Sequence, residues 1–352
     1  MPDAQVIRLP GTPAPDDQGA VPARVRRARP QRLARPTTAA PGPTGALSRP
    51  AAVGPEPETL GPPPEPGTAA PAEDEWEPRL AEVLAFLRRR LTGEYAIDDF
   101  GFDRELTERA VVPLLRPWYR QWFRVQASGL ENIPASGAAL LVANHSGTIP
   151  VDAMMTQLAV YDDHPAHRHL RLLAADFVFR LPYLGAMARK SGATLACYPD
   201  AARLLAGGEL VGVWPEGFKG IGKPFRERYR LQRFGRGGFV AAALRTGAPI
   251  VPVAIVGAEE IYPLIGEIPV LARLLGVPYF PVTPTFPWLG PLGLVPLPSR
   301  WLIEFGEPVL TDGYGPGAAD DAMLVLNLAD QVRETIQASV YRLLARRPSV
   351  FG

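Results

Sequence analysis

The chain has 352 residues, 47% of them hydrophobic, and its 37 basic and 36 acidic residues leave a formal net charge of +1. This balance argues against a nucleic-acid-binding role, which needs a basic face, and the single cysteine, Cys197, excludes a disulfide framework and a cysteine zinc site. No signal peptide is visible and no uncharged run of 18 apolar residues occurs, so we expect no transmembrane helix.

Residues 1–75 are predicted to form a disordered tail. They contain 17 prolines and no aromatic residue, so they cannot bury enough apolar surface to offset the loss of chain entropy on folding. Within this tail, residues 24–35 hold six arginines and no acidic residue. Such a run suits an anionic membrane surface or nucleic acid, but a solvated basic patch in a tether is the favoured interpretation.

Residues 76–124 are predicted to form N-terminal helices before an α/β catalytic core over residues 125–352. Apolar residues recur at helical spacing over residues 76–91. A second helix is expected to end in residues 113–125, where Trp118, Tyr119, Trp122 and Phe123 alternate with arginines. This mixture suits a membrane interface, and packing of the aromatic side chains on the core explains it equally well.

From residue 138 onward, short apolar segments alternate with helical ones. This order predicts an α/β fold with a mostly parallel central sheet flanked by helices. Strands are expected at residues 138–143, 170–174, 210–214, 250–256 and 301–305. Helices are expected at residues 150–161, 199–206, 237–246 and 318–346.

Polar residues follow three of these strands. His145 comes after the first, Glu216 after the third, and Glu259 and Glu260 after the fourth. Because sites in such sheets form beyond the carboxyl ends of the strands, these side chains are expected to converge.

The strongest local pattern is VANHSGTIPVD at residues 142–152. The His145 imidazole could take a proton from an alcohol at neutral pH, and Asp152 could hold its other ring nitrogen. The alternatives are a structural turn for His145 and a favourable interaction with the helix dipole for Asp152.

In a second pattern, VWPEGFKG at residues 213–220, a predicted strand is followed by a turn and then by the cation Lys219. Glu216 beside backbone amides and Lys219 could orient a hydroxyl or hold an anionic headgroup, unless the segment is an ordinary polar turn. The third pattern, residues 247–253, is a helix end followed by a buried strand. Residues 162–169 gather three histidines around a proline, which favours a solvated loop over a metal site.

Taken together, the three patterns resemble the glycerolipid acyltransferases of the phosphate acyltransferase superfamily over roughly residues 125–308. The resemblance implies that His145 is the general base and Asp152 its partner. It also implies an acyl thioester donor, acyl-CoA or acyl carrier protein, and a lipid acceptor, with no further cofactor and no metal. The expected substrate-binding residues are Asn144, Ser146, Arg180, Glu216, Gly217 and Lys219.

The sequence departs from the family pattern at two places. Six residues separate His145 from Asp152, where the family usually has four. Cys197, Tyr198 and Pro199 stand where the family has an arginine for the acceptor phosphate. A phosphate-free acceptor is therefore expected, as in the monoacylglycerol and diacylglycerol acyltransferase-like subgroup.

Residues 262–298 are rich in Pro, Leu and Phe and nearly free of charge. They are predicted to form an acyl-chain groove or a membrane-facing lip, with core packing as the alternative. We thus expect a cytoplasmic acyltransferase that is peripherally associated with the cytoplasmic membrane. The alternative is a non-catalytic lipid-binding or scaffold protein on the same fold.

Overall fold

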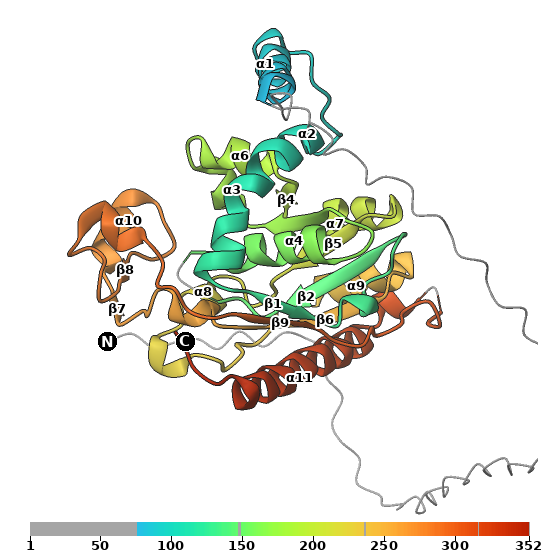
Figure 1. Ribbon diagram of the computed structural model, residues 1–352. Coiled ribbons are helices and arrows are strands. Elements are labelled where there is room, and N and C mark those ends of the chain that lie inside the picture. The colour runs from blue at the N-terminus through green and yellow to red at the C-terminus, as the bar shows by residue number, and fades with distance from the viewer. Residues whose placement is uncertain (1–75, 147–148, 236, 316, 352) are drawn as a thin grey trace, which may run out of the picture. The chain divides into compact units, whose positions relative to one another are not determined.

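The computed structural model describes residues 76–146, 149–235, 237–315 and 317–351, which belong to one compact unit (Figure 1). The predictions for the tail at residues 1–75 and its basic run lie outside the described residues. The division into N-terminal helices and a core beginning at residue 125 stays a prediction.

A mostly parallel sheet lies at the centre of this unit (Figure 1). Its strands are β1 (Gln126–Ser128), β2 (Ala139–Ala143), β3 (Leu170–Ala174), β4 (Ala193–Leu195), β5 (Leu210–Val213), β6 (Ile250–Val256) and β9 (Leu302–Phe305). They are arranged in the order β1-β9-β6-β2-β5-β3-β4. The pairing of β9 with β6 is antiparallel, and the other pairings within this sheet are parallel. The predicted α/β fold class is therefore confirmed.

Helices cover both faces of the sheet (Figure 1). The described helices are α1 (Trp76–Thr92), α2 (Arg104–Leu106), α3 (Val112–Pro117), α4 (Val151–Asp163), α5 (Asp176–Arg180), α6 (Leu184–Lys190), α7 (Tyr198–Ala206), α8 (Phe218–Ile221), α9 (Gly238–Thr246), α10 (Pro269–Leu275) and α11 (Ala322–Arg346). Of these, α1 and α10 lie away from the sheet (Figure 1). A π-helical turn at Thr107–Val111 joins α2 to α3, and a second at Trp118–Trp122 extends α3, so residues 104–122 form one helical stretch. Short 3-10 turns lie at Leu130–Asn132, Phe225–Glu227, Ala258–Glu260, Gly290–Leu294 and Ala318–Asp320.

The alternation of side chains along the buried strands divides the core into two layers. In β2, Leu140 and Val142 pack against α7, α9 and α11. Their neighbours Leu141 and Ala143 face the opposite side, with α4 and residues 104–122. Because both faces are covered, β2 and β6 are buried along their whole length.

The last predicted helix begins later than expected. The Asp321 side chain accepts hydrogen bonds from the N–H groups of Met323 and Leu324, so it caps α11 and ends the preceding 3-10 turn at Asp320. The expected helix over residues 318–346 is thus two elements.

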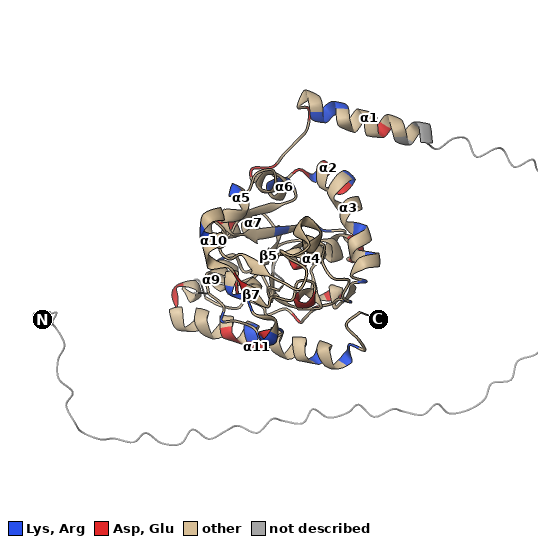
Figure 2. Ribbon diagram, turned by 90° about the vertical axis from the view of Figure 1, so that its left-hand side faces the viewer, with Lys and Arg blue, Asp and Glu red and all other residues tan. Residues whose placement is uncertain are grey.

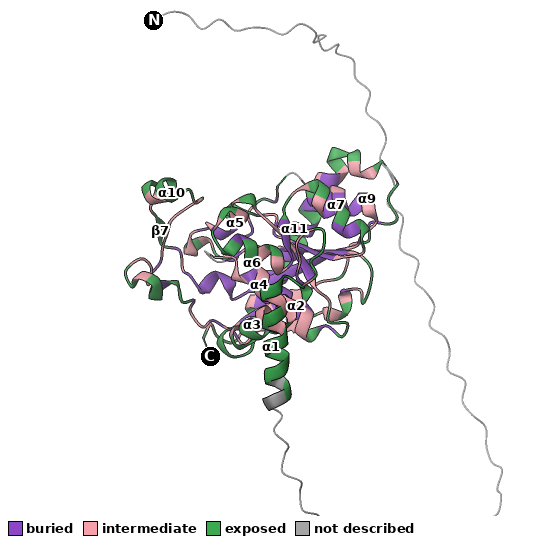
Figure 3. Ribbon diagram, turned by 90° about the horizontal axis from the view of Figure 1, so that it is seen from above, coloured by how far each residue is buried: buried purple, intermediate pink, exposed green. Residues whose placement is uncertain are grey.

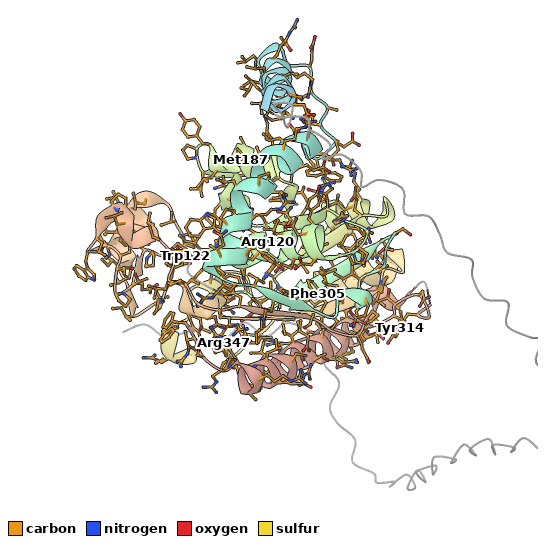
Figure 4. The ribbon with its side chains drawn as sticks, in the orientation of Figure 1. Arg120, Trp122, Met187, Phe305, Tyr314 and Arg347 are labelled. Atoms are coloured by element: carbon orange, nitrogen blue, oxygen red, sulfur yellow. The ribbon has the colours of Figure 1, made fainter. Side chains whose placement is uncertain are left out.

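The aromatic residues at the end of the stretch 104–122 divide between core and surface. Tyr119 and Phe123 are 2% and 0% exposed and belong to the core, so packing explains these two. Trp122 is 37% exposed, and its indole N–H donates to the Pro296 carbonyl at 3.0 Å (Figure 4).

An apolar stripe on α1 is open to solvent (Figure 3). Leu80, Val83, Leu84, Leu87 and Leu91 are all exposed. The contacts of α1 with the rest of the unit include ion pairs from Arg89 and Arg90 to Asp103 and Glu105.

Residues 262–298, hereafter the apolar segment, leave the sheet after β6 and form a small lobe around α10. The lobe contains a two-stranded sheet of β7 (Gly266–Glu267) and β8 (Pro281–Val282). Only two charged residues, Glu267 and Arg273, occur in the segment, in contrast to the charged outer face of α11 (Figure 2). Its exposed large apolar side chains are those of Ile265, Val270, Leu274, Leu275, Trp288, Leu289, Leu292, Leu294 and Val295.

Candidate active site

His145 and Asp152 meet beyond the carboxyl end of β2. The His145 Nδ1 lies 2.8 Å from Asp152 Oδ2. A carboxylate only accepts hydrogen bonds, so the neutral ring carries its proton on Nδ1 and leaves the Nε2 lone pair for another partner. The His145 side chain is 13% exposed and Asp152 is fully buried. This geometry suits an imidazole that takes up a proton.

The six-residue spacing is compatible with this contact because Asp152 occupies the first turn of α4. Asp152 Oδ2 also accepts from the Ser146 N–H at 2.9 Å, and Oδ1 accepts from the Ala153 N–H at 2.9 Å. The carboxylate therefore fixes both the ring and the backbone that follows it. The Ser146 hydroxyl is buried and has no hydrogen-bond partner among the described residues.

Asn144 ties β2 to β6. Its side-chain N–H group donates to the Ile255 carbonyl at 3.0 Å, and its oxygen accepts from the Ile255 N–H at 2.7 Å. The side chain is fully buried, so these contacts place it under the His145 turn. That Asn144 also contacts substrate stays a prediction.

Glu216 holds the His145 turn from the end of β5. One oxygen accepts from the His145 N–H at 2.9 Å, and the other accepts from the Gln232 N–H at 2.6 Å. Burial raises the pKa of Glu216, and the charge of Lys223 and these two N–H groups oppose that rise. The carboxylate contacts the protein itself, so acceptor binding by Glu216 stays a prediction.

The other expected binding residues lie at the surface. Gly217 and Lys219 are exposed at the start of α8, and the Gly217 φ of +53° with ψ of −138° suits glycine. The side chain of Arg180 is 79% exposed and pairs with Asp176 at 2.8 Å. Its helix α5 approaches α8 through Phe177 and Phe218, whose ring centroids are 5.2 Å apart.

Sequence reasoning missed the structural role of Gly220. A Cβ atom there would lie 2.8 Å from Glu216 Cβ, 2.9 Å from His145 Cβ and 2.9 Å from the His145 carbonyl oxygen. Only glycine lets α8 approach the His145 turn so closely. The glycines within and after the pattern VWPEGFKG, at residues 217, 220 and 222, were the sequence signal for such a close approach.

Two aromatic residues, Trp214 beside His145 and Tyr279 in the apolar segment, were also missed. The centroid of the Trp214 ring lies 6.1 Å from that of His145. Burial, followed by the charge of Asp152, raises the pKa of Tyr279. The Tyr279 ring lies beside Gly222, where a Cβ atom would be 3.8 Å from Tyr279 Cδ1, so the apolar segment reaches the chain just after α8.

Among the residues whose positions the structure describes, no cluster of three or more His, Cys, Asp or Glu side chains suits a metal ion. In the same part of the chain, no helix combines the length and hydropathy needed to cross a bilayer.

Comparisons with known proteins find related sequences over most of the chain. The family model named Acyltransferase matches residues 124–256. An uncharacterized protein of Mycobacterium tuberculosis is 61% identical over 272 residues, which cover 77% of this chain and 76% of that protein. A Mycobacterium leprae protein, also named uncharacterized, is 58% identical over 284 residues, covering 81% of this chain and 77% of its own.

More distant similarities lie among lipid enzymes. The Homo sapiens protein named DGAT1/2-independent enzyme synthesizing storage lipids is 24% identical over 221 residues, which cover 62% of this chain and 61% of that protein. The crystal structure of the 1-acyl-sn-glycerophosphate acyltransferase PlsC from Thermotoga maritima matches with a TM-score of 0.45 and 20% identity, covering 70% of this chain and 85% of that one. The residues matched by the family model run from β1 through β6 and include His145, Asp152 and Glu216, and the chain belongs to the glycerolipid acyltransferase superfamily.

Proposed function

We propose that this protein transfers a fatty acyl group from an acyl thioester to the hydroxyl of a lipid, with His145 as the general base. The observation that carries the proposal is the 2.8 Å contact between His145 Nδ1 and Asp152 Oδ2. It orients the ring and leaves Nε2 as the base, and the negative carboxylate stabilises the imidazolium that forms when Nε2 takes a proton.

The chemistry then follows in two proton transfers. His145 Nε2 takes the proton of the acceptor hydroxyl while the hydroxyl oxygen attacks the thioester carbonyl carbon. The tetrahedral intermediate collapses with cleavage of the carbon–sulfur bond, and the imidazolium returns its proton to the leaving sulfur. The products are an ester and a free thiol, so the step needs no redox partner, metal or further cofactor.

The proposed acceptor is a phosphate-free lipid alcohol such as a monoacylglycerol or diacylglycerol. Cys197 and Tyr198 stand at the start of α7 where the family pattern has an arginine. The name of the human relative, which refers to synthesis of storage lipids, supports the same acceptor class. Acyl-CoA and acyl carrier protein are both proposed as donors.

Product analysis with the purified full-length chain tests this function. Each donor is incubated with monoacylglycerol, diacylglycerol, lysophosphatidic acid and a fatty alcohol, and thiol release and ester formation are both quantified. We expect one ester to form for each thiol released, and we expect monoacylglycerol and diacylglycerol to be preferred over lysophosphatidic acid. Lipid binding without thioester consumption would show a non-catalytic protein on the acyltransferase fold.

We further propose that the apolar segment rests on the membrane that supplies the lipid acceptor. Its side chains at Leu274, Trp288 and Leu292 are 78%, 71% and 72% exposed. A surface of this kind, with an exposed tryptophan and few charges, favours the interface of a bilayer. Since the Tyr279 ring of the same segment lies 3.8 Å from where a Cβ atom at Gly222 would stand, just after the Gly220 contact with the His145 turn, a docked segment would bring the bilayer close to the site.

Flotation with liposomes of phosphatidylcholine and phosphatidylglycerol tests this placement. A variant with Leu274, Trp288 and Leu292 replaced by Ser should lose most of its liposome binding. In the matched control, Leu310, Met323 and Tyr341, which are also exposed, are replaced by Ser. This variant should bind liposomes like the wild type. Equal binding by both variants would contradict the placement.

A further inference from the structure

The ammonium group of a buried lysine, Lys223, lies near Glu216 Oε2, whereas the His145 N–H donates to Glu216 Oε1. The Lys223 Nζ is 3.1 Å from Glu259 Oε1 and 3.8 Å from Glu216 Oε2. The side chains of Lys223, Glu216 and Glu259 are 2%, 0% and 6% exposed. A single ammonium group thus lies near two carboxylates that are almost completely buried.

Such a group is sensitive to the loss of any member. Two buried carboxylates without a cation cannot both remain ionised, because burial penalises each charge and like charges repel. Burial raises the pKa of Glu259 to about 7, although the charge of Lys223 opposes this rise. The pKa of Glu216 is raised by burial in the same way, again against the charge of Lys223.

The ionisation state of Glu216 matters for the geometry of the site. As a carboxylate it accepts one backbone N–H on each oxygen, from His145 and from Gln232. A protonated carboxyl has one oxygen that carries a hydrogen and accepts more weakly. Protonation would therefore loosen either the His145 turn or the loop at Gln232.

We propose that Lys223 is a positioning residue: its ammonium group keeps Glu216 ionised, and Glu216 in turn holds the backbone of His145. Its effect on acyl transfer rests on the proposed function. The positioning itself is independent of it, because the backbone N–H contact exists without substrate.

The charged groups around this cluster come from several elements. His145 follows β2, Glu216 follows β5, Glu259 lies in the 3-10 turn after β6, and Lys223 follows α8. Glu260, the neighbour of Glu259, is neutralised separately, since Arg347 from the end of α11 contacts it at 2.6 Å (Figure 4). The Tyr229 phenol lies 3.5 Å from the Arg347 guanidinium, and burial raises its pKa above its usual range.

Kinetics of Lys223→Met, Glu216→Gln and the double variant test the proposal, with Lys190→Met as the matched lysine control. We expect Lys223→Met to lower kcat by about 10- to 100-fold, as for a misplaced catalytic group, with KM of donor and acceptor unchanged. In the double variant, loss of Lys223 should add nothing to the loss of Glu216, because both act through one contact. Losses that multiply, or a Lys223→Met variant with wild-type kcat, would overturn the proposal.

The pH profile separates positioning from a packing role. Without its cation, Glu216 ionises only at higher pH, so the acidic limb of kcat against pH should move upward in Lys223→Met. In Glu259→Gln, Lys223 pairs with Glu216 alone, and the acidic limb of kcat should move to lower pH or stay where it is in the wild type. Upward movement in both variants would contradict the proposal.

Amide hydrogen exchange gives a readout that needs no turnover. At neutral pH the His145 and Gln232 N–H groups should exchange faster in Lys223→Met than in the wild type. In Lys190→Met they should exchange at the wild-type rate. If the wild type shows this difference but no acyl transfer, the proposed function fails and the positioning stands. If Lys223→Met does not fold, Glu259→Gln provides the test. Faster exchange of these N–H groups in Glu259→Gln than in the wild type overturns the proposal, and exchange that is equal to or slower than in the wild type supports it.

Discussion

At the scale of single residues, the site depends on how many hydrogen bonds one carboxylate accepts. Asp152 receives the His145 ring, the Ser146 N–H and the Ala153 N–H, so it orients the proposed base and fixes the chain next to it. A group with fewer acceptor positions cannot replace it.

Replacement of Asp152 by Asn is therefore expected to lower kcat by about 10²- to 10⁴-fold, because the amide has one acceptor oxygen and favours the wrong imidazole tautomer. Steady-state thiol release measures the effect. The control is Asp312→Asn, which changes an exposed aspartate. Wild-type kcat in Asp152→Asn would remove the carboxylate from the mechanism.

Gly220 is a second residue at which a small change should have a large effect. Its replacement by Ala introduces a Cβ within 2.9 Å of His145 and Glu216, so we expect a loss of about 1–3 kcal/mol in the free energy of unfolding together with a lower kcat. Gly238→Ala is the control, since its Cβ would meet no atom within 4 Å. Chemical denaturation and thiol release measure the two effects, and equal behaviour of both variants would show that α8 does not constrain the turn.

At the scale of elements, a charged contact joins the stretch 104–122 to α4. Arg116 and Arg120 pair with Asp162 at 2.9 and 3.2 Å. Burial alone would raise the pKa of Asp162, but the hydrogen bonds and charges of the two arginines outweigh it and lower that pKa. A carboxyl with a lowered pKa in the folded state adds stability above its unfolded pKa, and this contribution is lost as the pH falls through the folded value.

Asp162→Asn should accordingly be less stable than the wild type between pH 5 and 7, and the difference should shrink below about pH 4. Thermal unfolding across this pH range measures it. The control Asp330→Asn changes an exposed aspartate and should follow the wild type throughout. A difference that is independent of pH would show that the charge of Asp162 is not the cause.

Elements with a strong local signal could be predicted from sequence. The bounds of β3 and β6 agree with the prediction. β6 is an apolar run that is buried along its whole length, and β3 is apolar except for Arg171. Less could be predicted for residues 104–122, where one helical stretch contains two π-helical turns, and for β9, whose antiparallel pairing with β6 leaves no mark in its own sequence.

At the scale of the whole molecule, the fold brings together groups that are far apart in the chain. The parallel strands β2 and β5 place His145 and Glu216 at one edge, as the sequence predicted. The contact of Lys223 with Glu259, 36 residues later, depends on the chain after α8 lying beside the 3-10 turn that follows β6. No local pattern in the sequence indicates such a contact, so it could not be predicted.

Turnover by His145→Ala, compared with His167→Ala, is the most direct test of the role of His145 in acyl transfer. His167 is an exposed histidine outside the candidate site and controls for the substitution itself. We predict that His145→Ala folds, binds liposomes like the wild type and loses ester formation and thiol release together, whereas His167→Ala keeps both. Ester formation by His145→Ala at the wild-type rate would contradict the role of His145 as the general base.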